Sequence, residues 1–154
     1  MQLVGELIHL RALEPTDLNQ LYRWENDSSI WSVSGTLVPF SKFVLEEFVT
    51  QVHQDIYTNK QLRLIVDLKY FDEADEDETT RSIGCVDLFD FDPKNKRAGV
   101  GILIADKADR GRGYATEALH LIVDYAFEVL DLHQIYSNVR VENESSVALF
   151  KKVG

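Results

Sequence analysis

Val100-Gly101-Ile102-Leu103-Ile104-Ala105 is the stretch that decides the fold, together with Arg110-Gly111-Arg112-Gly113-Tyr114-Ala115 just after it. The first run is apolar like a buried strand, and an amphipathic segment from Tyr114 to Leu130 follows the glycines. Glycines at this point let main-chain N–H groups turn toward a single anion, and a helix that begins there adds partial positive charge. With Arg110 and Arg112 beside them, the glycines favour a phosphate site; an ordinary strand-to-helix turn with solvated arginines is the alternative.

Composition indicates a single globular domain. The 154 residues are 45% hydrophobic, and no apolar run approaches the roughly 20 residues that a membrane span needs. Without a basic leader or an apolar signal core, the chain is predicted to be cytoplasmic, with no membrane partner. A net charge of −10 argues against nucleic-acid binding and favours a cationic partner.

The cysteine and histidine content argues against an internal disulfide and against a metal site. The lone Cys85 cannot form an internal disulfide, and its apolar surroundings predict buried packing rather than reactivity. None of the four histidines lies at metal-ligand spacing from another, so no metal is expected. The acidic run over residues 72–78 has no glycine at a bend, which favours a solvated hairpin tip over a Ca²⁺ loop.

Hydrophobic patterning predicts strands and helices in mixed order, an α/β class. Alternating or β-branched runs predict strands over 7–11, 61–68, 83–91, 98–105 and 134–141. Helical spacing and capping residues predict helices over 15–25, 41–53, 114–130 and 144–152. Trp31 and Phe40, in the irregular stretch between the first two helices, could line a substrate pocket or cap the edge of the core.

The glycine loop does not match the common nucleotide-binding fingerprints. Thr116 stands where a dinucleotide fold would have its third glycine, and no Gly-Lys-Ser/Thr ending marks a nucleoside-triphosphate loop. A pyrophosphate cradle of a different spacing is the remaining interpretation.

With these residues in place, the chain resembles the GNAT superfamily of N-acetyltransferases. The family signature Gln/Arg-x-x-Gly-x-Gly/Ala is met at residues 110–115, and residues 10–18, 101–105, 116–119, 132–139 and 141–154 resemble its other motifs in order. The resemblance implies an acyl-CoA N-acyltransferase-like α+β fold, with a central, mostly antiparallel, splayed sheet flanked by helices. Family members usually continue past the position of Gly154 into further strands, so we expect one acetyltransferase domain over residues 1–154 that lacks them.

Acetyl-CoA is the co-substrate that the resemblance implies, without a metal. It assigns the main chain of Ile102, Leu103 and Ile104 to the pantetheine arm, and an amide near Leu103 to polarisation of the thioester carbonyl. It assigns the pyrophosphate to the loop and the helix start after it. The remaining contacts fall on Asn143 and the final helix, so the expected CoA-binding residues in the loop and beyond are Arg110, Gly111, Arg112, Gly113, Tyr114, Ala115, Thr116, Asn143 and Phe150.

Two groups that many relatives use for catalysis are missing. Phe150 stands where many relatives have a tyrosine as general acid, and Gly99 where many have a glutamate. Asp87 is the candidate general base and Tyr136 a weaker candidate acid; the alternative for each is an ordinary strand side chain facing solvent. Direct attack by the amine needs no nucleophilic residue, in keeping with the lack of a Cys-His or Ser-His pairing.

The sequence therefore predicts transfer of acetyl from acetyl-CoA to a primary amine. The acceptor could be a polyamine, a small amine or a protein N-terminus, since the chain resembles both spermidine and ribosomal-protein N-terminal acetyltransferases. A homo-oligomer is one assembly that would cover an open sheet edge. The alternative function is a non-catalytic acyl-CoA-binding module, motivated by Phe150 and Gly99.

Overall fold

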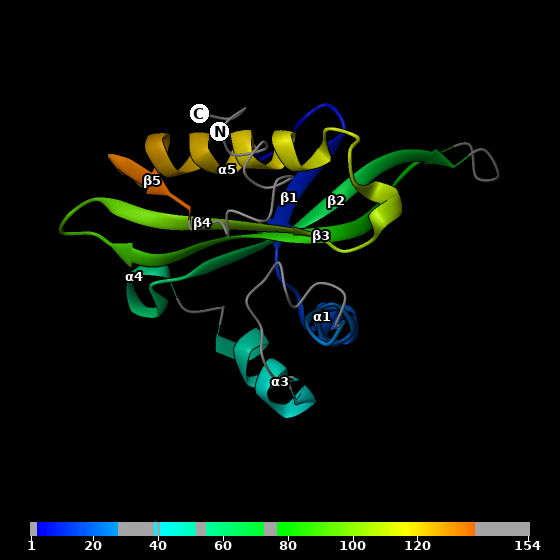
Figure 1. Ribbon diagram of the computed structural model, residues 1–154, viewed down its shortest axis with the longest axis horizontal. Coiled ribbons are helices and arrows are strands. Elements are labelled where there is room, and N and C mark those ends of the chain that lie inside the picture. The colour runs from blue at the N-terminus through cyan, green and yellow to red at the C-terminus, as the bar shows by residue number, and fades with distance from the viewer. Residues whose placement is uncertain (1–2, 28–38, 40, 52–54, 73–76, 138–154) are drawn as a thin grey trace.

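A five-stranded sheet in the order β1-β2-β3-β4-β5 forms the centre of the molecule (Figure 1). The computed structural model describes residues 3–27, 39, 41–51, 55–72 and 77–137. Neighbouring strands are antiparallel except β4 and β5, which are parallel. This is the mixed, mostly antiparallel sheet that the resemblance implied. The strands are β1 (Ile8–Ala12), β2 (Leu62–Asp72), β3 (Asp77–Asp92), β4 (Arg97–Ile104) and β5 (Gln134–Tyr136).

Helices cover both faces of this sheet. Helix α5 (Tyr114–Glu128) lies on one face, and α1 (Leu18–Glu25) and α3 (Lys42–Gln51) lie on the other (Figure 1). Three single-turn elements connect them: η1 (Pro15–Asp17), α4 (Ile56–Asn59) and η2 (Lys107–Asp109). The glycine loop lies between η2 and α5, at the end of the sheet where β4 stops.

The core on the α5 side follows the predicted periodicities. Alternate residues of β4, Ala98 and Val100, are buried there against Leu119 and Ile122 of α5. Phe127 departs from the predicted apolar face of the helix, because its side chain is 42% exposed near the end of α5. The prediction that this helix packs on a sheet is confirmed.

A second core lies on the α1 side. It combines Leu21 and Trp24 of α1 with Val49 of α3, Ile65 of β2 and Cys85 of β3. Burial raises the pKa of the Cys85 thiol to about 12, so the thiol is neutral at physiological pH. The predicted packing role of Cys85 is therefore confirmed.

An ion-pair network fastens β1 to its neighbours on the same side of the sheet. The Arg11 guanidinium donates to both carboxylate oxygens of Asp17, each at 2.8 Å, and its Nε donates to Asp67 Oδ2 at 2.7 Å. Asp17 and Asp67 are buried. Because one arginine holds two buried carboxylates, this cluster links β1, η1 and β2.

Several boundaries differ from the predictions. Strands β2 and β3 reach to Asp72 and back to Asp77, so both ends of the acidic run are strand residues, and 73–76 lie outside the described part. The sequence pattern also missed α4, because one turn of helix is too short to show a period. Asp55 caps this turn through Thr58 N–H, and Lys60 ends it with a φ of 59°. Within the described residues, no helix is long and apolar enough to cross a membrane.

Candidate active site

The glycine loop has the geometry of an anion cradle. Gly111 and Gly113 adopt φ angles of 73° and 86°, in the left-handed region that favours glycine. Among the described residues, a Cβ added at either position would meet nothing within 4 Å, so this part of the chain leaves space in front of the loop. The main chain therefore turns here in a way that leaves room for a bound group.

Helix α5 begins directly behind this cradle. Gly113 is its N-cap residue, and its carbonyl accepts the N–H of Glu117 at 3.1 Å. The N–H groups of Tyr114, Ala115 and Thr116 precede this bond and have no acceptor within the helix. They add to the partial positive charge at the start of α5, which suits a phosphate.

The two loop arginines also form hydrogen bonds that hold the loop in place. Arg110 Nε donates to the Ile104 carbonyl at 3.0 Å, and Arg112 Nε donates to the Ala108 carbonyl at 2.8 Å. Both side chains are exposed. Each arginine thus holds the loop against the end of β4 or against η2, while its terminal nitrogens provide further donors for an anion.

Strands β4 and β5 pair over only three residues among those that the structure describes. They pair from Arg97 to Gly99 on β4 and from Gln134 to Tyr136 on β5, whereas β4 continues to Ile104. In the described part of the chain, no strand pairs with this edge of β4 beyond Gly99. Within the described residues, the main-chain groups on this edge of β4 therefore have no strand partner beside the cradle.

Strand alternation determines which of these groups face the open edge. Ala105 N–H donates to the Ile83 carbonyl on β3 at 2.9 Å, and the β3–β4 register is continuous from Gly84–Ile104 to Phe89–Gly99. Leu103 therefore also directs its N–H toward β3, while Ile102 and Ile104 direct theirs to the open edge. Among the described residues, the N–H groups on this edge are thus those of Ile102 and Ile104 rather than the N–H of Leu103.

Position 99 of β4 has no room for a side chain unless the neighbouring Phe89 ring moves. The Phe89 ring occupies the space that a side chain on Gly99 would need. Tyr136, opposite Gly99 in the β4–β5 register, packs edge-on against the same ring at a centroid distance of 6.3 Å. Tyr136 is half-buried in the last described pair of β4 and β5.

Asp87 is held by an arginine. Arg63 Nε and Nη2 donate to its two carboxylate oxygens at 2.8 and 2.7 Å. Both oxygens of the candidate base therefore accept charge-assisted hydrogen bonds. The structure thus places Tyr136 and Asp87 on the strands beside β4, each in an aromatic or ionic contact that the sequence pattern did not reveal.

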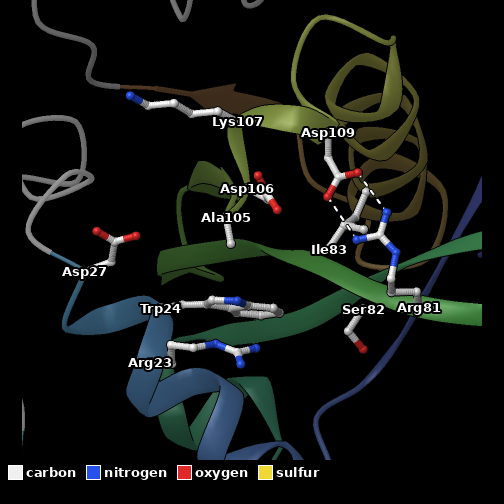
Figure 2. Close-up of a pocket in the computed structure, with 10 residues that line it drawn as sticks. All are labelled: Arg23, Trp24, Asp27, Arg81, Ser82, Ile83, Ala105, Asp106, Lys107 and Asp109. Carbon is white, nitrogen blue, oxygen red and sulfur yellow. Dashed lines mark hydrogen bonds and ion pairs between the residues drawn. The ribbon is translucent and has the colours of Figure 1, made fainter.

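A hollow of about 540 Å³ adjoins the cradle on the α1 side of the sheet (Figure 2). Trp24 lines one wall, and Ala105 and Lys107, in the segment after β4, line another. Arg81 and Asp109 form a bidentate ion pair in a third wall, with distances of 3.1 and 2.8 Å. The sequence analysis assigned none of these residues to a site, because Arg81 and Asp109 meet only when β3 and η2 come together.

The remaining predicted contacts fall outside the described residues. These are Asn143 and Phe150, together with the pocket candidates Trp31 and Phe40. In the part that is described, no group of three or more His, Cys, Asp or Glu side chains could hold a metal ion.

Comparison with known proteins decides the family. A model of the acetyltransferase (GNAT) domain matches residues 8–154. The chain belongs to the GNAT acetyltransferase family. It is therefore an N-acetyltransferase that depends on acetyl-CoA, and the glycine cradle and the β4 edge, which has no strand partner among the described residues beyond Gly99, fit that co-substrate.

Individual GNAT relatives cover nearly the whole chain. The spermidine N(1)-acetyltransferase of Vibrio cholerae is 31% identical over 145 residues, which are 94% of this chain and 76% of the relative. The probable N-acetyltransferase YjcK of Bacillus subtilis is 31% identical over 153 residues, 99% of this chain and 82% of the relative. The crystal structure of the Vibrio cholerae spermidine N-acetyltransferase with CoA and spermine has a TM-score of 0.81 at 29% identity, and covers 97% of this chain and 81% of that one.

Proposed function

We propose that this GNAT acetyltransferase acts on a primary amine of a polyamine, by direct attack of the amine on acetyl-CoA. The observation that supports binding of acetyl-CoA is the edge of β4 beside the glycine cradle, which has no strand partner among the described residues. The acceptor half is supported by the relatives named spermidine acetyltransferases and by the net charge of −10, which attracts a polycation.

The donor side uses main-chain groups. We assign the pyrophosphate to Gly111, Gly113 and the N–H groups at the start of α5, with Arg110 and Arg112 as further donors. When bound, acetyl-CoA supplies the acetyl group and the thiolate leaving group. The Ile102 or Ile104 N–H faces the open edge and can donate to the carbonyl oxygen as negative charge develops there.

The acceptor side must remove a proton. An alkylamine with a pKa near 10.4 is almost fully protonated at pH 7, and forming its neutral state costs roughly 4–5 kcal/mol, at about 1.36 kcal/mol per pH unit. A carboxylate or a water molecule near β4 can accept that proton. We retain Asp87 as the candidate base and Tyr136 as the candidate acid for the departing thiolate.

Substitution separates these roles. If Tyr136 protonates the thiolate, Tyr136→Phe lowers kcat with little change in the KM for the amine, because the ring still packs on Phe89. If Asp87 removes the proton, Asp87→Asn lowers kcat. Unchanged kcat in either variant removes that residue from the chemistry.

The deciding experiment is thiol release from acetyl-CoA with a panel of acceptors: spermidine, spermine, monoamines, amino acids, and peptides ending in alanine or serine. Release that depends on spermidine or spermine supports the proposal. Faster release with peptides or monoamines assigns the acceptor to a protein N-terminus or a small amine instead. CoA binding by calorimetry without release for any acceptor would support the non-catalytic binding module.

Two broader features are proposed along with this reaction. We expect a cytoplasmic location, where acetyl-CoA and polyamines are both available, and a homo-oligomer that covers an edge of the sheet. Light scattering of the purified protein measures the second directly.

A further inference from the structure

An ion pair joins strand β3 to the turn that leads into the glycine cradle. Arg81 Nη2 and Nη1 donate to the two carboxylate oxygens of Asp109 at 2.8 and 3.1 Å (Figure 2). Asp109 is the last residue of η2, and Arg110, the first residue of the glycine loop, follows it directly. The pair therefore holds the chain at the point where the loop starts.

The register of the sheet explains how Arg81 reaches this turn. Strand β4 ends at Ile104, which is opposite Gly84 on β3. Ala105 N–H then donates to the Ile83 carbonyl at 2.9 Å. Because the two strands are antiparallel, the part of β3 that includes Arg81 continues past the end of β4 and runs beside the segment that follows it.

The pair fixes a buried carboxylate. The side chain of Asp109 is 8% exposed and that of Arg81 is 49% exposed, so the arginine reaches inward from the surface. The hydrogen bond to Asp109 raises the pKa of Arg81 above its ordinary value, against the lowering effect of burial, so the guanidinium stays charged. Asp109 can leave its position only by giving up charge-assisted hydrogen bonds at both oxygens.

The turn that contains Asp109 is joined to the glycine loop by bonds of its own. Asp106 caps η2 by accepting the Ala108 N–H at 3.0 Å. Further along the loop, Arg112 Nε donates to the Ala108 carbonyl. The turn and the loop thus form one connected unit, and a displacement of Asp109 from β3 would carry the loop with it.

We propose that Arg81 is a positioning residue for acetyl-CoA: through Asp109, it sets the place of the glycine cradle at the end of β4. The inference rests on the proposed assignment of the pyrophosphate to this cradle. Arg81 itself need not touch the co-substrate.

The charge of Asp109 alone would have a different effect. A carboxylate one residue before an anion site repels the anion, so its removal would strengthen CoA binding if only charge mattered. The positioning role predicts the opposite result, because Asp109→Asn breaks the contact that holds the loop.

Calorimetric titration with CoA tests the inference in Arg81→Gln, Asp109→Asn and the double variant. We expect the Kd for CoA to rise about fivefold or more in each single variant, and no further in the double variant, because both substitutions break the same contact. Arg81→Lys keeps the charge without the bidentate fork, so it should recover only part of the affinity. In kinetics, the KM for acetyl-CoA should rise while the KM for the amine changes less than about twofold.

Asp17→Asn is the matched control. Asp17 is also a buried carboxylate that one arginine, Arg11, binds at both oxygens, but it holds η1 and not η2. This variant should lower the Tm without changing the Kd for CoA. An equal rise in the Kd for Asp17→Asn would make the Arg81 pair a general stabilising contact and overturn the inference.

Two further results would overturn it: an unchanged Kd in Arg81→Gln, or tighter CoA binding by Asp109→Asn. Because Arg81 lies at the surface, Arg81→Gln decides the matter if Asp109→Asn does not fold. Gly113→Ala separates this inference from the proposed function. Weaker CoA binding by Gly113→Ala with full affinity in Arg81→Gln overturns the inference alone, whereas full affinity in Gly113→Ala, or no CoA binding by the wild type, overturns the cradle assignment as well.

Discussion

The Phe89 ring fills the space that a side chain on Gly99 would need. A side chain at position 99 must displace this ring, which also packs against Tyr136. We expect Gly99→Ala and Gly99→Glu to reduce the free energy of unfolding by about 1–3 kcal/mol, as overpacking does in well-packed structures. Urea denaturation measures the loss. The double variant Phe89→Ala/Gly99→Glu has room for the carboxylate, so it should be more stable than the single variant Gly99→Glu. Equal stability of the two variants would contradict the steric explanation.

Gly113 provides a test of the cradle. Its φ of 86° strains any residue with a Cβ, although nothing lies within 4 Å of that position. Gly113→Ala should therefore cost about 1–2 kcal/mol of stability through the backbone alone. Gly113→Asn should cost less, since asparagine tolerates the left-handed region better. If the cradle binds pyrophosphate, calorimetry will also show weaker CoA binding for Gly113→Ala; full affinity in this variant would count against the assignment.

The loop arginines should contribute charge to CoA binding. Replacing both Arg110 and Arg112 with alanine removes donors to a phosphate and also the bonds to Ile104 and Ala108. We expect CoA affinity to fall at least tenfold, and its dependence on salt to weaken. Lysine at both positions retains the charges, so partial recovery would separate electrostatics from loop geometry. Unchanged affinity in the alanine variant would mean that these arginines serve the loop alone.

The lowered pKa of Asp17 allows a prediction of how the free energy of unfolding depends on pH. Burial would raise its pKa, but hydrogen bonds from Arg11 and from Glu14 N–H outweigh this, so the folded-state pKa lies below the ordinary value of 3.8. The stabilisation is present above about pH 4 and is lost as the pH falls through the folded-state pKa. Asp17→Asn should cost about 3 kcal/mol at pH 7, and the difference from wild type should shrink near pH 3.

Urea denaturation at both pH values measures this difference. Asp131→Asn is the control, because Asp131 forms an exposed pair with Lys96 that should matter little at either pH. A wild-type advantage over Asp17→Asn that is the same at pH 3 and pH 7 would rule out the ionised carboxylate as its source.

Local patterns were sufficient to predict most of the fold. The helical spacing of Leu119 and Ile122 and the alternation in β3 and β4 identified α5 and the central strands, because burial of one face leaves a period in the sequence. The glycine spacing likewise indicated the cradle, since it reflects a local backbone requirement. Boundaries were less certain: β2 and β3 continue into charged residues that carry no apolar signal.

Contacts between distant residues could not be predicted in this way. Arg63 meets Asp87 and Glu25 across separations of 24 and 38 residues, and each of the three residues resembles an ordinary surface charge in sequence. The sequence likewise indicated that Gly99 lacks an expected carboxylate, but the reason lies in Phe89 on the neighbouring strand. Register decides such pairings, and no single strand encodes its register with a neighbour.

Because Cys85 is buried, the reaction of its thiol with a reagent can report unfolding of the protein. This residue is 4% exposed, its thiol is protonated at neutral pH, and it is the only cysteine in the chain. A thiol-specific chromogenic disulfide should therefore react with released CoA within seconds and with the folded protein only as fast as the sheet opens. Turnover and global opening can thus be followed with one reagent on separate timescales, without labelling the protein.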